Sequence, residues 1–470
     1  MTRGLGDIGN LELYSQSYTG TKKLIEEFNE ELILALEYMY QSLPEDNRIS
    51  RRNKYEFFRG LRHMLGNTAL LLSGGGALGT HHIGVLEVLF EAGLLPRIIS
   101  GSSSGSIMAA MVCTRSDEEL LHLLKLEGLN MNFLDEPSVG PGWQQYWVKL
   151  RRLMNEGVVF DQSVLRTCLR ENIGHVTFLE AFKKTRRILN VSVSSSTQHE
   201  MPRMLNYLTA PNVLIWSAVL ASCAVPGVFM SSGLLAKDPR SGALIPWHPG
   251  DDTRWIDGSV ENDIPRARLA ELFNVNHFIV SQVNPHVYPF LERKRREPGP
   301  PSRINHLIRT ILYLIHSETC FRLHQLISLN LLFPNALHRL LSILTQKYDG
   351  DITVIPDLTL ADVRLLFADP SKEQIASSVR RGARATWPLI SVIWNQCRVE
   401  MLLDQMLAKM KKKSSGGSGS RSGLSSVQGG RKKRTGSTGS IPMRRSSSPL
   451  VYRTLEASMS IDDLSSAYND

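Results

Sequence analysis

The chain has 470 residues, enough for two or three domains, and 42% of them are apolar and 21% charged, as in an ordinary globular protein. The net charge of +9 is local, because residues 409–445 are rich in Lys and Arg and hold no acid, while the rest is nearly neutral. The five cysteines are scattered and form no CxxC pair, so the sequence indicates neither a zinc site nor a disulfide framework, and a reducing compartment fits best. We see neither a signal peptide nor an apolar run of about 18 residues, so a spanning helix is not expected.

The first predicted element is a helix that begins after Thr21 and ends before Pro44. Apolar residues recur there at helical spacing, namely Leu24, Ile25, Phe28, Leu32, Ala35, Leu36 and Met39. This pattern predicts a helical N-terminal domain over residues 1–66 that packs on the next domain.

Strands and helices then alternate. Short apolar runs predict four strands, at 69–73, 98–101, 187–194 and 277–283. Helical patterns at 80–92 and around Ile107, Ala110 and Met111 separate the early strands. Alternation of this kind predicts an α/β domain over residues 67–286, with a mainly parallel central sheet and helices on both faces.

The C-terminal part divides into a helical extension and a tail. Residues 287–408 are predicted to be mostly helical, and the Leu- and Ile-rich stretch 304–333 fits either a helix in a lipid surface or a helix pair in the core. Residues 409–470 form a basic, Ser/Gly-rich tail that we expect to be disordered and attracted to anionic surfaces. Its segment 444–449, RRSSSP, suits a basophilic kinase.

A glycine loop follows the first strand. Gly74, Gly75 and Gly76 come directly after Ser73, and such bare backbone can bring N–H groups close to a phosphate or to the oxyanion of a reacting ester. A phosphate-binding P-loop is disfavoured, since His81 and His82 stand where Lys and Ser/Thr would be sought. No acidic residue ends the next strand, as a dinucleotide site would require, so we expect no cofactor and no metal.

A candidate nucleophile follows the second strand. Residues 101–105, GSSSG, match G-x-S-x-G between a strand and a helix, with Ser103 at the central position. In a parallel sheet this turn and the glycine loop open at the same edge. Asp257, followed by Gly258, is the candidate base, because Gly258 would allow a close approach to Ser103.

In this order, SGGGALG (73–79), GSSSG and DGS (257–259) resemble the motifs of the patatin-like phospholipases. The resemblance implies a three-layer α/β/α fold and a Ser–Asp dyad without histidine. It assigns Ser103 as nucleophile, Asp257 as base, and the backbone of Gly74, Gly75 and Gly76 as oxyanion hole. Residues 13–39 are similar to the helical domain that precedes the patatin domain in fungal and plant triacylglycerol lipases, and the similarity covers about residues 10–408.

Two departures from the family pattern are visible. Ser73 and Leu78 stand where many patatins have Asp and Arg, which leaves the N–H donors in place. No histidine is followed by Asp five positions on, so the acyltransferase activity described for some fungal members is not expected. Fungal members usually extend further toward the N-terminus than this chain does.

The resemblance implies a serine lipid-ester hydrolase. We expect a triacylglycerol lipase that releases fatty acids at the surface of a lipid droplet, as a peripheral membrane protein on the cytoplasmic face. The alternatives are a phospholipase or lysophospholipid acyl hydrolase, an inactive lipid-droplet scaffold, and a Ser–Asp–His triad that uses His277 or His286. A nucleic-acid partner is not expected, because the folded part has no basic stripe interleaved with aromatic residues.

Overall fold

A computed structural model describes residues 3–14, 20–41, 50–126, 128–134, 143–195, 202–247, 254–259, 263–285, 287, 303–329, 334–359, 362, 366 and 368–415. Its centre is a seven-stranded sheet in the order β4-β3-β2-β1-β8-β9, with β7 also paired to β3. The strands are β1 (Asn67–Leu72), β2 (Ile98–Gly101), β3 (Ile188–Ser195), β4 (Arg203–Leu205), β7 (Trp255–Asp257), β8 (Val275–Ser281) and β9 (Ile352–Val354). A separate two-stranded sheet joins β5 (Leu235–Lys237) to β6 (Leu244–Pro246).

The pairing confirms the predicted mainly parallel sheet. Strand β1 is parallel to β2 and β8, β2 to β3, and β8 to β9, whereas β4 and β7 run antiparallel to β3. In the β1–β2 register Leu72 lies opposite Gly101, so both strands end at the same edge. The glycine loop and the G-x-S-x-G turn therefore open side by side.

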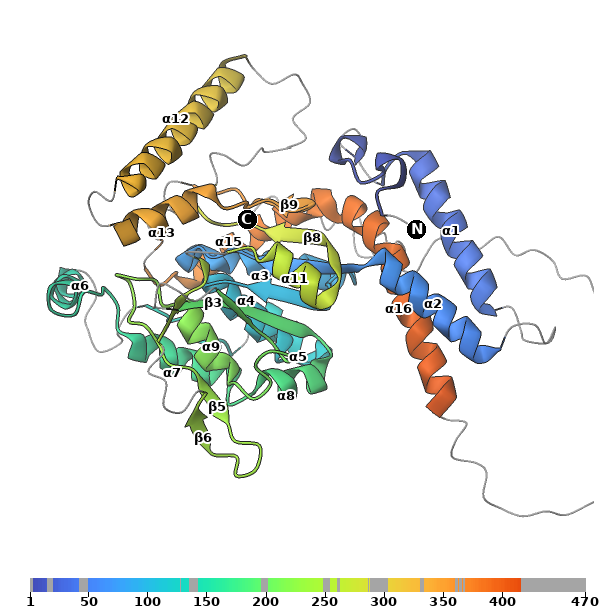
Figure 1. Ribbon diagram of the computed structural model, residues 1–470, viewed down its shortest axis with the longest axis horizontal. Coiled ribbons are helices and arrows are strands. Elements are labelled where there is room, and N and C mark those ends of the chain that lie inside the picture. The colour runs from blue at the N-terminus through green and yellow to red at the C-terminus, as the bar shows by residue number, and fades with distance from the viewer. Residues whose placement is uncertain are drawn as a thin grey trace, which may run out of the picture. The chain divides into compact units, whose positions relative to one another are not determined.

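Helices cover the sheet and extend beyond it (Figure 1). The α-helices are α1 (Lys23–Gln41), α2 (Arg51–Leu65), α3 (His81–Glu91), α4 (Ser104–Cys113), α5 (Asp117–Leu124), α6 (Trp143–Glu156), α7 (Gln162–Ile173), α8 (Phe178–Thr185), α9 (Ile215–Ser222), α11 (Arg266–Phe273), α12 (Arg303–Ser328), α13 (Pro334–Thr345), α15 (Lys372–Thr386) and α16 (Ile390–Ser415). Short 3₁₀ turns are η1 (Leu5–Asp7), η2 (Leu11–Tyr14), η4 (Gly76–Thr80) and η5 (Trp387–Leu389). Among the described residues, no helix combines the length and the apolar run that crossing a bilayer requires.

The two faces of the sheet bury separate cores. Side chains alternate along a strand, so Leu70 and Leu72 of β1 pack with α3, α4 and α9, while Ala69 and Leu71 pack on the opposite face with α11. Strand β8 alternates in the same way. Ile279 packs on the face covered by α3, α4 and α9, whereas Phe278 and Val280 pack on the face covered by α11. The sheet is thus sandwiched between helical layers, as the α/β/α prediction required.

The segment predicted as a helical extension also adds to the sheet. Strand β9 pairs with β8 at the sheet edge, and α15 packs on α3 so closely that a Cβ on Gly84 would lie 1.9 Å from the Val379 carbonyl oxygen. Strand β9 was not predicted, because three strand residues are too few to leave a periodic signal in the sequence. The predicted disorder from Lys409 is wrong for its first residues, because α16 continues to Ser415; residues 416–470 lie outside the described part.

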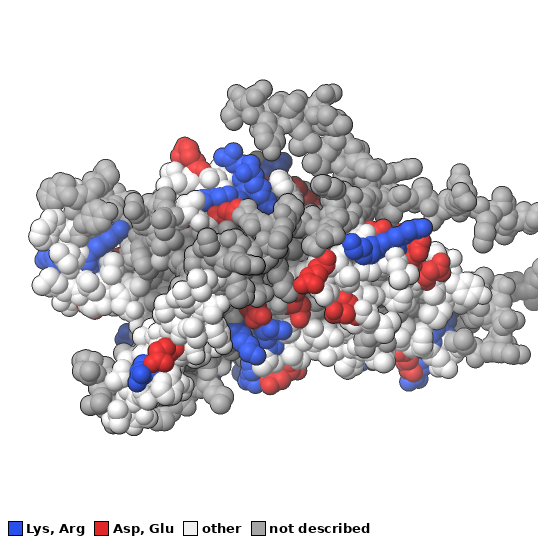
Figure 2. Space-filling view, turned by 90° about the horizontal axis from the view of Figure 1, so that it is seen from above, with Lys and Arg blue, Asp and Glu red and all other residues white. Residues whose placement is uncertain are grey.

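Charged side chains are mixed on the face drawn in Figure 2. Lys and Arg lie interspersed with Asp and Glu there, over a largely uncharged surface. Among the described residues of that face, no basic stripe tracks across the molecule as a phosphate backbone would require.

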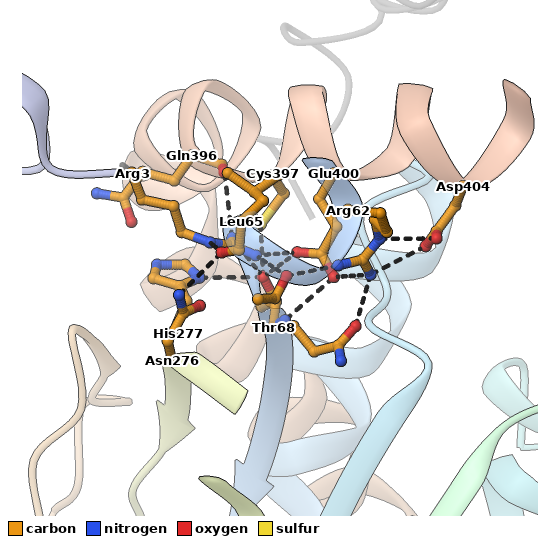
Figure 3. A network of polar contacts seen from close by, with 12 residues as sticks. Arg3, Arg62, Leu65, Thr68, Asn276, His277, Gln396, Cys397, Glu400 and Asp404 are labelled. Carbon is orange, nitrogen blue, oxygen red and sulfur yellow. Dashed lines mark hydrogen bonds and ion pairs between the residues drawn. The ribbon is translucent and has the colours of Figure 1, made fainter. Parts of the chain in front are cut away.

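A buried ion-pair network joins the two ends of the described chain (Figure 3). Arg62 of α2 contacts Glu400 at 2.7 Å and Asp404 at 2.8 Å, both on α16. Arg3 pairs with the other Glu400 oxygen at 2.5 Å, and Thr68 of β1 donates to Glu400 through its N–H (3.1 Å) and hydroxyl (2.6 Å). Figure 1 accordingly shows α1, α2 and α16 grouped together. The Glu400 carboxylate thus accepts hydrogen bonds from three separate segments, namely the N-terminal segment, α2 and β1.

We expect Glu400→Ala to lower the free energy of unfolding by about 3 kcal/mol, because it leaves the largely buried Arg3 without a carboxylate partner and leaves Arg62 with Asp404 alone. Urea unfolding followed by circular dichroism measures this change. Glu27→Ala, which breaks the exposed Lys23–Glu27 pair, is the control and should shift stability by less than about 1 kcal/mol. Equal effects of both substitutions would contradict the central role of Glu400.

Candidate active site

The turn at Ser103 is strained, and close packing forces that strain. Ser103 has φ 50° and ψ −127°, between the end of β2 and the start of α4. A Cβ on Gly105 would lie 2.2 Å from the Leu72 carbonyl oxygen, and a Cβ on Gly101 would lie 2.4 Å from the Gly105 carbonyl oxygen. Both glycines are therefore required, and the half-buried Ser103 stands at the edge of the sheet.

Hydrogen bonds anchor this turn to its neighbours. The Ser103 N–H donates to Ser222 Oγ at 3.1 Å, and Ser222 Oγ donates to the Ser192 carbonyl at 2.8 Å. Helix α9 and strand β3 thus hold the backbone of Ser103. Ser222 belongs to no sequence motif and was not among the predicted site residues.

Asp257 reaches Ser103 from the antiparallel strand β7. It lies opposite Val193 of β3, and a Cβ on Gly258 would come within 2.4 Å of the Ser192 carbonyl oxygen. Asp257 is fully buried; its Oδ1 accepts the Ser259 N–H at 2.8 Å, and its Oδ2 makes no hydrogen bond of ordinary geometry with a described residue. Burial raises the pKa of Asp257 to about 6, and the Ser103 hydroxyl is one neighbour that lowers this pKa.

The three loop glycines differ in what their N–H groups do. Gly74 packs on Ser103, since a Cβ there would lie 3.3 Å from Ser103 Cβ, and its N–H donates to Asp263 Oδ1 at 3.0 Å. Gly75 (φ 152°) and Gly76 (φ 57°) begin the turn η4, and their N–H groups donate to no described residue. Of the three predicted glycines, Gly74 is therefore already engaged, and Gly75 and Gly76 offer free donors.

Asp263 is a second buried carboxylate at the site, and it was not predicted from the sequence. Its Oδ2 accepts a hydrogen bond from Asn284 Nδ2 at 2.8 Å. Burial is the main cause that raises the pKa of Asp263 to about 7, and the nearby negative charge of Asp257 contributes to the same rise. An acid six positions after Asp257 has no motif of its own, so only the fold reveals its place.

The described histidines near the site make hydrogen bonds with other groups and not with Ser103. Buried His82 contacts the Ser73 carbonyl through Nε2 (2.9 Å) and Ser281 Oγ through Nδ1 (2.7 Å), and burial lowers the pKa of His82 to about 4. His277 faces Thr68 near the start of β1, about 20 Å of extended chain from the glycine loop at about 3.3 Å per residue. It therefore cannot complete a triad with Ser103, and His286 lies outside the described residues.

Metal-ligating groups do not gather in the described part of the chain. No cluster of three or more His, Cys, Asp or Glu side chains suited to a metal ion occurs there. The five cysteines are unpaired, and all but Cys320 are buried.

Comparison with known proteins places this geometry in a family. Residues 70–269 match the model of the patatin-like phospholipases, and residues 1–63 match a domain of unknown function (DUF3336). The chain is 41% identical to triacylglycerol lipase 4 of Saccharomyces cerevisiae, over 87% of this chain and 45% of that protein. It is 38% identical to triacylglycerol lipase ptl3 of Schizosaccharomyces pombe (88% and 84%) and to triacylglycerol lipase SDP1L of Arabidopsis thaliana (86% and 50%).

The chain spans about half the length of two of these three curated relatives, but most of the length of ptl3. Identity at this level over most of both chains, together with the family model, agrees with the motifs and with the α/β/α fold. The chain belongs to the patatin-like phospholipase family, in the subgroup of the fungal and plant triacylglycerol lipases.

Proposed function

We propose that the chain is a serine lipid-ester hydrolase that releases fatty acids from triacylglycerol through a Ser103–Asp257 dyad. The observation that carries the proposal is the meeting of three groups at one sheet edge. These are the strained Ser103, a buried Asp257 whose Oδ2 makes no hydrogen bond of ordinary geometry with a described residue, and the N–H groups of Gly75 and Gly76, which donate to none of the described residues. The names of the relatives favour triacylglycerol as the substrate.

The arrangement accounts for acyl transfer in two steps. Asp257 takes the Ser103 hydroxyl proton while Oγ bonds to the ester carbonyl carbon, and the carbonyl electron pair moves to oxygen, where Gly75 and Gly76 donate to it. The ester C–O bond then breaks, and the leaving diacylglycerol alkoxide takes the proton from Asp257. Water, deprotonated by Asp257, then bonds to the carbonyl carbon of the acyl-enzyme. The bond between that carbon and Ser103 Oγ breaks, Ser103 Oγ takes the proton back from Asp257, and the fatty acid is released.

Asp257 suits the role of base because of its burial. A carboxylate is ordinarily a weak base toward a hydroxyl, and burial that raises the pKa of Asp257 to about 6 strengthens it. The group is still ionised above pH 6, so it can accept the proton at neutral pH.

Attachment to a lipid droplet or membrane surface is supported by exposed apolar side chains. Helix α12 packs against α13, yet it exposes Leu307, Ile311, Tyr313, Leu314, Ile315 and Phe321. Helix α6 exposes Trp147, Leu150, Leu153 and Met154, with Arg151 among them. A helix with exposed apolar and basic side chains suits an interface of lipid and water better than a core helix pair.

Ser103→Ala should abolish fatty-acid release from emulsified trioleoylglycerol, with a loss of at least about 10³-fold, because no other hydroxyl occupies the central position of the turn. Ser104→Ala, which removes the adjacent buried hydroxyl, is the matched control and should keep most activity. Phosphatidylcholine vesicles assayed in parallel identify the phospholipase alternative. Equal release by wild type and Ser103→Ala would overturn the nucleophile and favour a scaffold without activity.

His286→Ala distinguishes a dyad from a triad. A dyad predicts kcat within a few-fold of wild type, whereas a triad histidine would cost about 10³-fold or more. Steady-state hydrolysis of p-nitrophenyl butyrate measures the difference, and a loss of the larger size would replace the dyad by a triad.

Asp257→Asn should inactivate the protein and also stabilise it above pH 6. The pKa of Asp257 is about 6 in the fold and near 3.8 in the unfolded chain, so folding opposes its ionisation by about 3 kcal/mol above pH 6. The ionisation of Asp257 thus lowers the free energy of unfolding of the wild type as pH rises from about 4 to 6. The difference in stability between Asp257→Asn and wild type should therefore vanish toward pH 4. Thermal unfolding at pH 4.5, 6 and 8 measures this, and an equal Tm of both proteins at pH 8 would refute it.

A further inference from the structure

Asp263 links three loops that meet at the candidate site. Its Oδ1 accepts the Gly74 N–H after β1, and its Oδ2 accepts Asn284 Nδ2 after β8. Its own N–H donates to Gln346 Oε1 at 3.0 Å, and Gln346 Nε2 donates to the Ser259 carbonyl at 3.2 Å, next to Asp257. The side chain is buried, and both of its oxygens are used as acceptors.

The glycine loop needs such an anchor. Three consecutive glycines have wide backbone freedom, and Gly75 and Gly76 adopt positive φ angles without any hydrogen bond from their own N–H groups to a described residue. Stabilisation of an oxyanion depends on donors that are oriented before the reaction. The bond from Gly74 to Asp263 fixes the peptide immediately before those two donors.

We propose that Asp263 is a positioning residue, which holds the glycine loop so that the N–H groups of Gly75 and Gly76 face the carbonyl oxygen of an ester at Ser103. The assignment rests on the proposed hydrolase function for its catalytic consequence. Its structural content, the fixed glycine loop, is measurable without any substrate.

The contact geometry defines a specific exchange of residues. In Asp263→Asn the new amide has one acceptor, so either the Gly74 N–H or the Asn284 amide loses its partner. In Asn284→Asp two carboxylates face each other. The double variant Asp263→Asn/Asn284→Asp restores the pattern, because the oxygen of the new amide can accept from Gly74 while the NH₂ group of that amide donates to the new carboxylate.

Two measurements on the full chain test the proposal. The first is kcat and KM for p-nitrophenyl butyrate at pH 8, per active site titrated with a fluorophosphonate. The second is hydrogen–deuterium exchange of the peptide that covers residues 73–79. For Asp263→Asn we expect kcat to fall about 10²-fold with KM within a few-fold, and exchange of the loop to accelerate. The double variant should regain at least about 10-fold in kcat and slow the exchange.

The outcomes separate this proposal from the hydrolase proposal. Wild-type turnover that depends on Ser103, with kcat per titrated site unchanged in Asp263→Asn, overturns the positioning role and leaves the hydrolase standing. Absence of turnover in wild type overturns the hydrolase; loop exchange then decides, and unchanged exchange in Asp263→Asn overturns the positioning role. If Asp263→Asn does not fold, Asn284→Ala should give a smaller kcat loss with faster loop exchange, and wild-type values for both would overturn the proposal.

Discussion

The parallel pairing of β1 with β2 is the constraint on which the candidate site depends. Because Leu72 lies opposite Gly101, β1 and β2 end side by side at the same edge of the sheet. The glycine loop after β1 and the Ser103 turn after β2 are therefore neighbours. Gly105 packs closely against Leu72, and Ser103, two residues earlier in the same tight turn, adopts a positive φ angle. Hydrophobic burial on both faces of β1 stabilises the fold well enough to maintain that strained turn.

Two buried carboxylates stand beside this turn, and their surroundings give them different tasks. Asp257 keeps one oxygen without an ordinary hydrogen-bond partner among the described residues, so it remains available to a proton. Asp263 uses both oxygens as acceptors and is therefore occupied with holding backbone and amide groups. Burial raises the pKa of both groups, but hydrogen bonding separates a reactive carboxylate from a structural one.

The sequence predicted those parts of the site that have a local signature. The two strands before Gly74 and Ser103 are short apolar runs beside glycines. The structure confirms both strands and shows that they end side by side. The engagement of the Gly74 N–H depends on Asp263, which is distant in sequence and belongs to no motif. Strand β9 and the Ser222 contact were missed for the same reason, since their partners come from distant segments.

The ion pairs around Glu400 have a consequence for how the chain can be divided. A cut at residue 66, where the sequence suggests a boundary, would remove Arg3 and Arg62 and leave Glu400 and Asp404 of α16 without those cations. Contacts accordingly group Met1–Leu407 as one compact unit. The segment matched by the domain of unknown function is thus integral to the folding unit of the α/β layers, and an expression fragment that begins at β1 would carry an uncompensated buried charge.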